Sequence, residues 1–302
     1  MESQKIVLMD AEAHVFGDNT GMTYILTVTP ATFMNKSVDV NTNIENKKTN
    51  YSLRSRKSTI KATMNQFTLH KEHAITIVLR DSVKYLDNLC KVISDEKMST
   101  KIKNKIDEKI FADVRKGFTD DVVVEIKSMD FRPAMEFIFN EYVPKHGGHM
   151  ASFCVLLDLK NLESTQNRLG VKPIFQNIDV YPETGLLVKK VPILTDIRSI
   201  IGDRSKKFIE DYIKFISLSD VNLKNQLTFF NRKYISTSLE SFMTFLSLKH
   251  NNKNYTQSHN SIKDVEDLFE LITWGIKYDG LEIFDGKSYL HEPKDYSTSF
   301  KF

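Results

Sequence analysis

The chain has 302 residues, of which 41% are hydrophobic and 27% are charged, as in a globular protein with a sizeable core. A net charge of +3 is too small to identify a nucleic-acid-binding protein, so the distribution of charge matters more. The two cysteines, Cys90 and Cys154, have no metal-ligand spacing and indicate a reducing compartment. Neither a signal peptide nor a run of about 18 apolar residues is present, so we expect an intracellular protein that does not span a membrane.

The first part of the chain predicts one strand followed by a basic arm. Met22–Thr29 is an apolar and β-branched run that Pro30 ends, and it lies in an N-terminal segment of residues 1–34. Residues 35–61 are rich in Asn, Thr, Ser and Lys and predict a loop or mobile arm. This arm could follow phosphates while Tyr51 stacks on a base, although a solvated loop is the alternative. Its basic residues are Lys47, Lys48, Arg54, Arg56, Lys57 and Lys61.

A helical insertion is predicted at about 82–116, after a short strand over Ala74–Leu79. Apolar residues recur at three- and four-residue spacing from Val83 to Ile93 and again from Ile102 to Val114, which predicts two helices. The second helix has a lysine-rich polar face, which is either solvated or part of a positive surface that binds phosphates. The predicted members of that surface, besides the arm, are Lys101, Lys105, Arg232 and Lys233.

Residues 62–197 predict a β-core around this insertion. Strands are expected at 122–126, 135–143 and 150–158, and further short strands at 172–176 and 186–193. Strands at this spacing, with turn signals between them, favour an antiparallel sandwich or barrel.

Residues 198–302 predict a helical C-terminal region with an acidic tail. Helical periodicity covers 208–216, 239–246 and 262–272. The amphipathic face at 204–216 is expected to pack on the core rather than on lipid. Nine acidic and five basic residues occupy 259–302, so we do not expect this end to contact phosphate.

No catalytic constellation is apparent. Phosphate-binding and dinucleotide-binding glycine motifs are absent from the sequence, and Cys154 lies in an apolar run that disfavours a thiolate. His146 and His149 are three residues apart in a turn, but no further ligand follows at metal-site spacing. We therefore predict no enzyme, no cofactor and no metal site. A metal-dependent nuclease that uses His146 and His149 is kept as a third hypothesis.

One pattern in the central region resembles a known family. Met135–Pro144 predicts a strand that ends at proline, a glycine turn at Gly148 follows, and the apolar run Met150–Asp158 ends in aspartate. This pattern is similar to the core of the thirty-kilodalton superfamily of plant-virus cell-to-cell movement proteins, of the type found in plant rhabdoviruses (cytorhabdoviruses). The similarity covers roughly residues 120–197.

The resemblance implies a fold and a function. The fold would be β-rich α+β, with an antiparallel jelly-roll-like β-sandwich, a helical insertion and a helical C-terminal region. The function would be transport of single-stranded RNA or a viral nucleocapsid complex through plasmodesmata, without sequence specificity and without catalysis. Asp158 would then be structural and cap the turn after its strand.

The implied partners are a viral phosphoprotein or nucleoprotein, host plasmodesmal proteins, a peripheral membrane surface and a second copy of the chain. The implied location is the host cytoplasm, cell periphery and plasmodesmata. The alternative is an RNA-packaging protein, either nucleocapsid-like or single-strand-binding.

Overall fold

The computed structural model describes most of the chain. The described residues are 4–17, 20–42, 58–107, 117–120, 122–176, 192–229, 234–251, 255, 260–279, 288 and 290.

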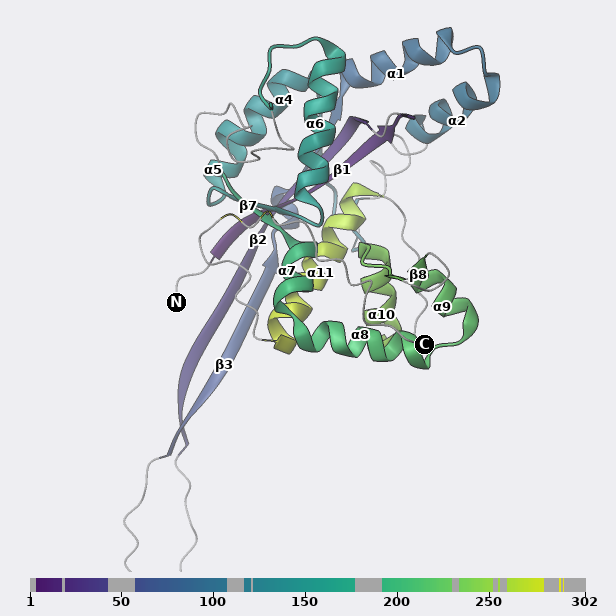
Figure 1. Ribbon diagram of the computed structural model, residues 1–302. Helices are drawn as coiled ribbons and strands as arrows, with labels where there is room; N and C mark the ends of the chain where they lie inside the picture. Colours follow the sequence, from purple (N-terminus) through teal and green to yellow (C-terminus); the bar gives the residue numbers. More distant parts are fainter. Residues whose placement is uncertain are drawn as a thin grey trace, which may run out of the picture.

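A mixed β-sheet forms the centre of the molecule (Figure 1). Its strand order is β5-β4-β2-β1-β6-β7, and β3 pairs with the remaining length of β2. The pairs β1–β2, β2–β3 and β2–β4 are antiparallel, whereas β1–β6, β6–β7 and β4–β5 are parallel. The strands are β1 (Gln4–Val15), β2 (Gly21–Thr42), β3 (Ser58–Leu69), β4 (Ile75–Leu79), β5 (Glu125–Met129), β6 (His149–Ser152) and β7 (Ile193–Asp196). The predicted antiparallel jelly-roll sandwich is therefore wrong.

The long strand β2 serves two parts of the molecule. Its first half lies between β1 and β4 in the sheet, and Ala31–Thr42 pairs with Ser58–Leu69 in a two-stranded ribbon. Figure 1 shows this ribbon extending away from the helices. Residues 35–42 and 58–61 are thus strand rather than loop, and residues 43–57 of the predicted arm lie outside the described residues.

One face of the sheet is covered by α6 and by a helical segment that precedes β6. Alternate residues of β1, such as Val7 and Met9, point to this face and are buried. The covering elements are α4 (Phe131–Phe137), a π-helical turn η3 (Ile138–Tyr142), α5 (Val143–Lys145) and α6 (Val155–Leu169). The predicted strand at 135–143 is therefore wrong, because its apolar residues form a helical face.

The other face is covered by helices from the C-terminal third of the chain. Ile6 and Leu8 of β1 point to this face and pack in the same core as α8, α10 and α11. These elements are α7 (Ile197–Arg204), α8 (Lys206–Leu218), α10 (Leu239–Asn251) and α11 (Ser261–Asp279). Between them lie α9 (Val221–Leu227) and the small hairpin of β8 (Thr228–Phe229) and β9 (Tyr234–Ile235). The helices predicted at 208–216, 239–246 and 262–272 are confirmed.

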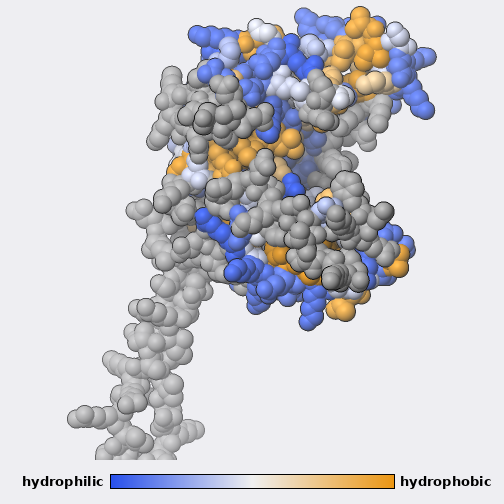
Figure 2. All heavy atoms as spheres, in the orientation of Figure 1, coloured by the Kyte–Doolittle hydropathy of each residue, from blue (hydrophilic) through white to orange (hydrophobic). Residues whose placement is uncertain are grey.

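Two helices follow β4, as the sequence predicted for the start of the insertion. They are α1 (Arg80–Val92) and α2 (Glu96–Asp107), and a short 3-10 turn η1 (Lys71–His73) precedes β4. Val92 and Met98 are 77% and 46% exposed where α1 meets α2. Figure 2 shows hydrophobic residues at this end of the molecule, beside hydrophilic ones. No described helix is long and apolar enough to cross a membrane.

The segment that carried the family resemblance has a different structure from the expected one. Pro144 lies in α5 rather than at the end of a strand, and β6 ends at Ser152. Asp158 is in the first turn of α6. Gly148 does form a turn, with a φ of +71° that favours glycine. Of the other predicted strands, β4 is confirmed, the strand at 122–126 begins only at Glu125, and 172–176 contains a single bridge residue.

Candidate metal centre

Two acidic side chains project from the middle strand β1. Asp10 and Glu12 are two residues apart, so both point to the face of the sheet that α11 covers. In the register with β2, Asp10 lies opposite Thr27 and Glu12 lies opposite Ile25. An irregularity in the pairing follows directly, between Glu12 and Ala13. The strand thus changes from a wholly apolar segment, Ile6–Met9, to one that presents carboxylates.

A third carboxylate reaches the same place from α11. The Asn260 side chain caps this helix by accepting a hydrogen bond from the Ile262 amide (2.9 Å). The Ser261 hydroxyl lies 2.7 Å from the Thr27 hydroxyl, which fixes the start of α11 above β2. Because Thr27 lies opposite Asp10, the first turn of α11 carries Asp264 over β1.

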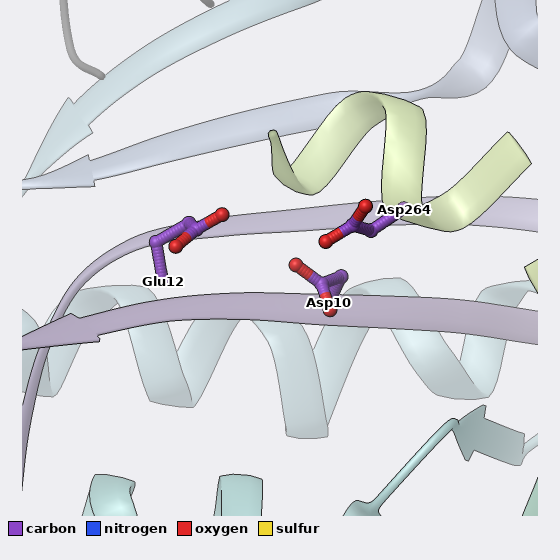
Figure 3. A group of neighbouring side chains, drawn as sticks. All are labelled: Asp10, Glu12 and Asp264. Carbon is purple, nitrogen blue, oxygen red and sulfur yellow. The ribbon is translucent and has the colours of Figure 1, made fainter. Parts of the chain in front are cut away.

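The carboxylates of Asp10, Glu12 and Asp264, here called the carboxylate cluster, converge (Figure 3). Their ligand oxygens all lie within 4.8 Å of one another. Asp264 is only 6% exposed, and Asp10 and Glu12 are half-buried. Within the described part of the chain, this is the one group of three or more His, Cys, Asp or Glu side chains that is close enough to share a metal ion.

Asp158, in the first turn of α6, is a further buried carboxyl group. Its buried carboxylate accepts a hydrogen bond from the Ser152 hydroxyl. Burial is the main reason that the pKa of Asp158 is raised to about 7, and the hydrogen bond from Ser152 opposes this shift. The negative charges of Asp196 and Glu12 raise the pKa of Asp158 as well, so this side chain lies within electrostatic reach of the carboxylate cluster.

Asp196, at the end of β7, extends the acidic region. Burial raises the pKa of Asp196 to about 6, although hydrogen bonds from Ser199 favour its charged form. One of them is the 2.9 Å bond from the Ser199 amide that caps α7. Asp196 therefore has a structural role, while its charge adds to the negative potential around Asp158.

The donor set suits a hard divalent cation. Mg²⁺ and Ca²⁺ prefer carboxylate oxygens at about 2.0–2.6 Å, so two ligand oxygens of one ion lie roughly 3–5 Å apart. The 4.8 Å limit within the carboxylate cluster meets that requirement. Burial raises the pKa of the Cys154 thiol to about 12, so this thiol is protonated at neutral pH. This neutral thiol agrees with the predicted inertness of Cys154.

Two other carboxylates of α11, those of Glu266 and Asp267, are engaged in ion pairs within the chain. Glu266 accepts a hydrogen bond from the Lys71 ammonium group (2.6 Å) and further bonds from Thr119. Asp267 pairs with Lys263 at 2.8 Å and accepts a hydrogen bond from the Tyr255 hydroxyl. These two side chains therefore connect α11 to neighbouring segments, and their positions have a structural explanation.

The structure does not assemble the histidine site that the sequence suggested. His149 is buried, and its Nε2 lies 2.7 Å from the Thr195 hydroxyl. His146 instead packs against the rings of Tyr142 and His73. The described residues thus place the two histidines in different surroundings, away from any three-ligand group.

The predicted nucleic-acid-binding residues are scattered or lie outside the described part of the chain. Lys61 is in β3, where its backbone pairs with that of Asp39, and Lys101 and Lys105 are in α2. The joint positive surface stays a prediction. The residues outside the described ranges are Lys47, Lys48, Arg54, Arg56, Lys57, Arg232 and Lys233.

The carboxylate cluster was not predicted from the sequence, although part of its signal was visible. Ile6–Met9 is a four-residue apolar run, and acidic residues follow it at alternating positions of a strand. Asp264, however, resembles any acidic residue in the first turn of a helix. Only the tertiary fold brings it to Asp10.

Comparison with known proteins adds little. No family model matches the chain, and no curated protein matches it. Among solved structures, one described as a full-length 3′-exonuclease is similar, with a TM-score of 0.38 and 13% identity over 100% of this chain and 94% of that chain. A TM-score this low carries no argument about fold or function. The movement-protein function stays a prediction, and the described residues form a mixed sheet rather than the jelly-roll that the resemblance implied.

Proposed function

We propose that this protein is a divalent-metal-dependent phosphodiesterase that hydrolyses nucleic acid. The observation that carries the proposal is the convergence of Asp10 and Glu12 with Asp264, which lies more than 250 residues further along the sequence. Such a group of carboxylates is favourable when cations neutralise its charge, and metal-dependent nucleases use carboxylates in this way.

The chain supplies rigid positions for the ligands. Asp10 and Glu12 are on the middle strand of the sheet, and hydroxyl contacts of Ser261, Thr27 and Thr76 hold the start of α11 above it. Bound divalent cations would polarise a phosphoryl oxygen and lower the pKa of a water molecule. Side chains on strands and packed helices can keep such ligands in place more precisely than loops can.

Asp158 has a different role from the cluster. The Asp158 Oδ2 atom accepts a hydrogen bond from the Ser152 hydroxyl. Because the pKa of Asp158 is about 7, its carboxyl group can hold a proton near neutral pH. Since Glu12 is one source of this raised pKa, cations bound at the cluster would lower it by cancelling negative charge. Asp158 would then lose its proton when cations bind.

The substrate class follows from charge. Phosphodiesters are negatively charged, so they approach carboxylates only when cations lie between them. The chain as a whole carries a net charge of +3, which does not oppose binding of a polyanion. This proposal replaces the predicted absence of enzymatic activity with a reaction that can be assayed directly.

The test is hydrolysis of 5′-labelled single-stranded RNA and DNA by the purified protein with Mg²⁺, with Mn²⁺ and with chelator. We expect cleavage only with a divalent cation. Asp264→Asn should lower the rate about a hundredfold or more, as expected when one charge-stabilising group is removed from an active site. Asp87→Asn, at an exposed position of α1, is the matched control.

Two results would contradict the proposal. One is the absence of cation-dependent cleavage of either substrate by the wild-type protein. The other is cleavage that Asp264→Asn and Asp87→Asn leave equally intact, with unchanged melting temperatures showing that both variants fold.

A further inference from the structure

A groove runs along α6 beside the turn that joins β1 to β2. Its volume is about 600 Å³. Figure 1 shows α6 crossing close to β1 and β2, and one stripe of this helix forms the wall of the groove. Six of the residues that line it are Gly21, Leu157, Lys160, Asn161, Ser164 and Arg168. We call it the α6 groove.

The floor of the α6 groove depends on a glycine. A Cβ atom at Gly21 would lie 2.1 Å from Oδ1 of the buried Asn161, so only glycine allows this close approach. Four residues further along α6, the Thr165 hydroxyl accepts a hydrogen bond from the Thr23 amide at 2.8 Å. These two contacts fix α6 against the start of β2 and set the width of the groove.

The α6 groove and the candidate metal centre share the hairpin of β1 and β2. Gly21, which lines the groove, lies opposite Val15 of β1, and Glu12 is three residues from Val15 on the same strand. Three residues of a strand span about 10 Å. A ligand in the groove would therefore lie along α6 and beside the part of β1 that carries the carboxylate cluster.

The far end of the α6 groove carries a fixed cation. The Arg168 guanidinium lies 3.9 Å from the centre of the Phe16 ring and donates a hydrogen bond to the Thr20 hydroxyl. Leu157 is 56% exposed at the near end. From Leu157 to Arg168 the helix spans about 16 Å, at 1.5 Å per residue.

The chemistry of the lining suits a polyanion with apolar parts. Lys160 and Arg168 are cationic, and Asn161, Ser164 and Thr20 offer amide and hydroxyl groups of the kind that bind phosphate and sugar oxygens. Glu163 contributes one negative charge. Leu157 adds an apolar surface. Small-molecule sites are mostly apolar, so this polar, elongated surface fits a strand better than a compact ligand.

We propose that the α6 groove binds a single strand of nucleic acid adjacent to the phosphodiester at the carboxylate cluster, which deepens the function proposed above and rests on it. The cluster binds cations and the groove positions the strand through its backbone. Recognition is independent of base sequence, because the lining groups that the proposal uses address phosphate and sugar. The volume of about 600 Å³ accommodates a short stretch of one strand rather than a double helix.

The experiment separates strand binding from hydrolysis. Fluorescence anisotropy of a labelled ten-residue oligonucleotide, in ribose and deoxyribose forms, is measured with Mg²⁺ on Asp264→Asn, so that the strand stays intact. Lys160→Glu and Ser164→Glu are added to this background separately. Lys206→Glu, at the exposed start of α8, is the matched charge reversal for Lys160→Glu. The single variants Lys160→Glu, Ser164→Glu and Lys206→Glu, which retain Asp264, are then assayed for cleavage. The substrates are the oligonucleotide and bis(p-nitrophenyl) phosphate, which is too short to reach the groove.

Both groove variants should weaken oligonucleotide binding about tenfold, and Lys160→Glu should reduce the salt slope of log affinity by about one. Lys206→Glu should leave both quantities unchanged. Cleavage of the small ester should be the same in these three single variants and in the wild-type protein. In the two groove variants, kcat/KM for the oligonucleotide should fall in proportion to the loss of oligonucleotide affinity.

Equal oligonucleotide binding by both groove variants and by Lys206→Glu would overturn the groove proposal, whatever the hydrolysis assay gives. Loss of small-ester cleavage in the groove variants would also overturn it, because the substitutions would then act on the metal centre. An inactive wild-type protein whose binding still depends on Lys160 and Ser164 would refute the phosphodiesterase and leave the groove assignment standing.

Discussion

Three acidic residues of α11 fall into two sets with different surroundings. Glu266 and Asp267 face Lys71 and Lys263, so cations of the chain itself offset their charge. Asp264, one turn earlier, lies among the carboxylates of Asp10 and Glu12. Glu266 and Asp267 are thus balanced by lysines, whereas the carboxylate cluster brings together negative charges from two elements, as the proposed cation site requires.

The largest expected effect is on cation binding. Replacing Asp10 by Asn together with Glu12 by Gln should weaken Mn²⁺ binding roughly a hundredfold, at the upper end of what loss of a supporting group near a metal costs. Isothermal titration calorimetry with MnCl₂ measures this change. The control combines Asp87→Asn with Glu270→Gln, two exposed acidic positions. Equal Mn²⁺ affinities in the two double variants would show that the carboxylate cluster binds cations no better than exposed acidic residues do.

Substitutions in the ion pairs of Glu266 and Asp267 should affect the stability of the fold rather than cation binding. Lys71→Met leaves Glu266, which is 11% exposed, without its 2.6 Å partner. The free energy of unfolding should fall by about 1–3 kcal/mol, because a charge-assisted hydrogen bond to a largely buried carboxylate is lost while the hydrogen bonds from Thr119 remain. Urea denaturation gives this value, and Lys103→Met in α2 should change it by less than about 0.5 kcal/mol. A change in Mn²⁺ affinity in Lys71→Met would show that the two sets are coupled.

Asp158 predicts a pH dependence of stability. Its pKa is about 7 in the folded protein against an ordinary value of 3.8, so the folded state binds more protons between these pH values. Without divalent cations, stability should therefore fall as pH rises through this window. Asp158→Asn should remove part of that fall and raise the melting temperature at pH 8 by a few degrees. Thermal melts of both proteins from pH 4 to pH 8 test this, and superimposable pH profiles would refute it.

The smallest effect is expected for an exposed ion pair outside both sets. Lys249 lies 2.6 Å from Asp211, and both side chains are about one-third exposed. Asp211→Asn should lower the free energy of unfolding by less than about 1 kcal/mol, as partly exposed pairs usually do. It should leave cation binding unchanged. A loss as large as that of Lys71→Met would mean that burial does not decide how strongly an ion pair stabilises this fold.

The sequence predicted the helices better than the sheet, for a physical reason. Met135, Phe137 and Phe139 alternate as in a strand, but the buried residues Phe131, Met135 and Ile138 have helical spacing. In a short apolar run both periods fit, and packing on the sheet decides between them. The long helices α8 and α11 repeat their apolar spacing over several turns, which leaves no such ambiguity.

The candidate site was harder to predict than the fold. Asp158 was singled out in the sequence, but with the structural role of closing a strand. Asp10 and Glu12 lie in a strand that was not predicted, because Ile6–Met9 is apolar on both faces of the sheet and lacks the alternation that indicates a strand. The meeting of Asp10 with Asp264 depends on a contact between distant segments, and no local periodicity encodes it.

The long separation in sequence between β1 and α11 has a consequence for synthesis. The hydroxyl contact between Thr27 and Ser261 and the arrival of Asp264 both require that α11 has left the ribosome. A nascent chain that has folded β1 and β2 still lacks one third of the carboxylate cluster. The complete site therefore assembles only after α11 has been translated, and an interrupted product that stops before residue 264 retains Asp10 and Glu12 but lacks Asp264.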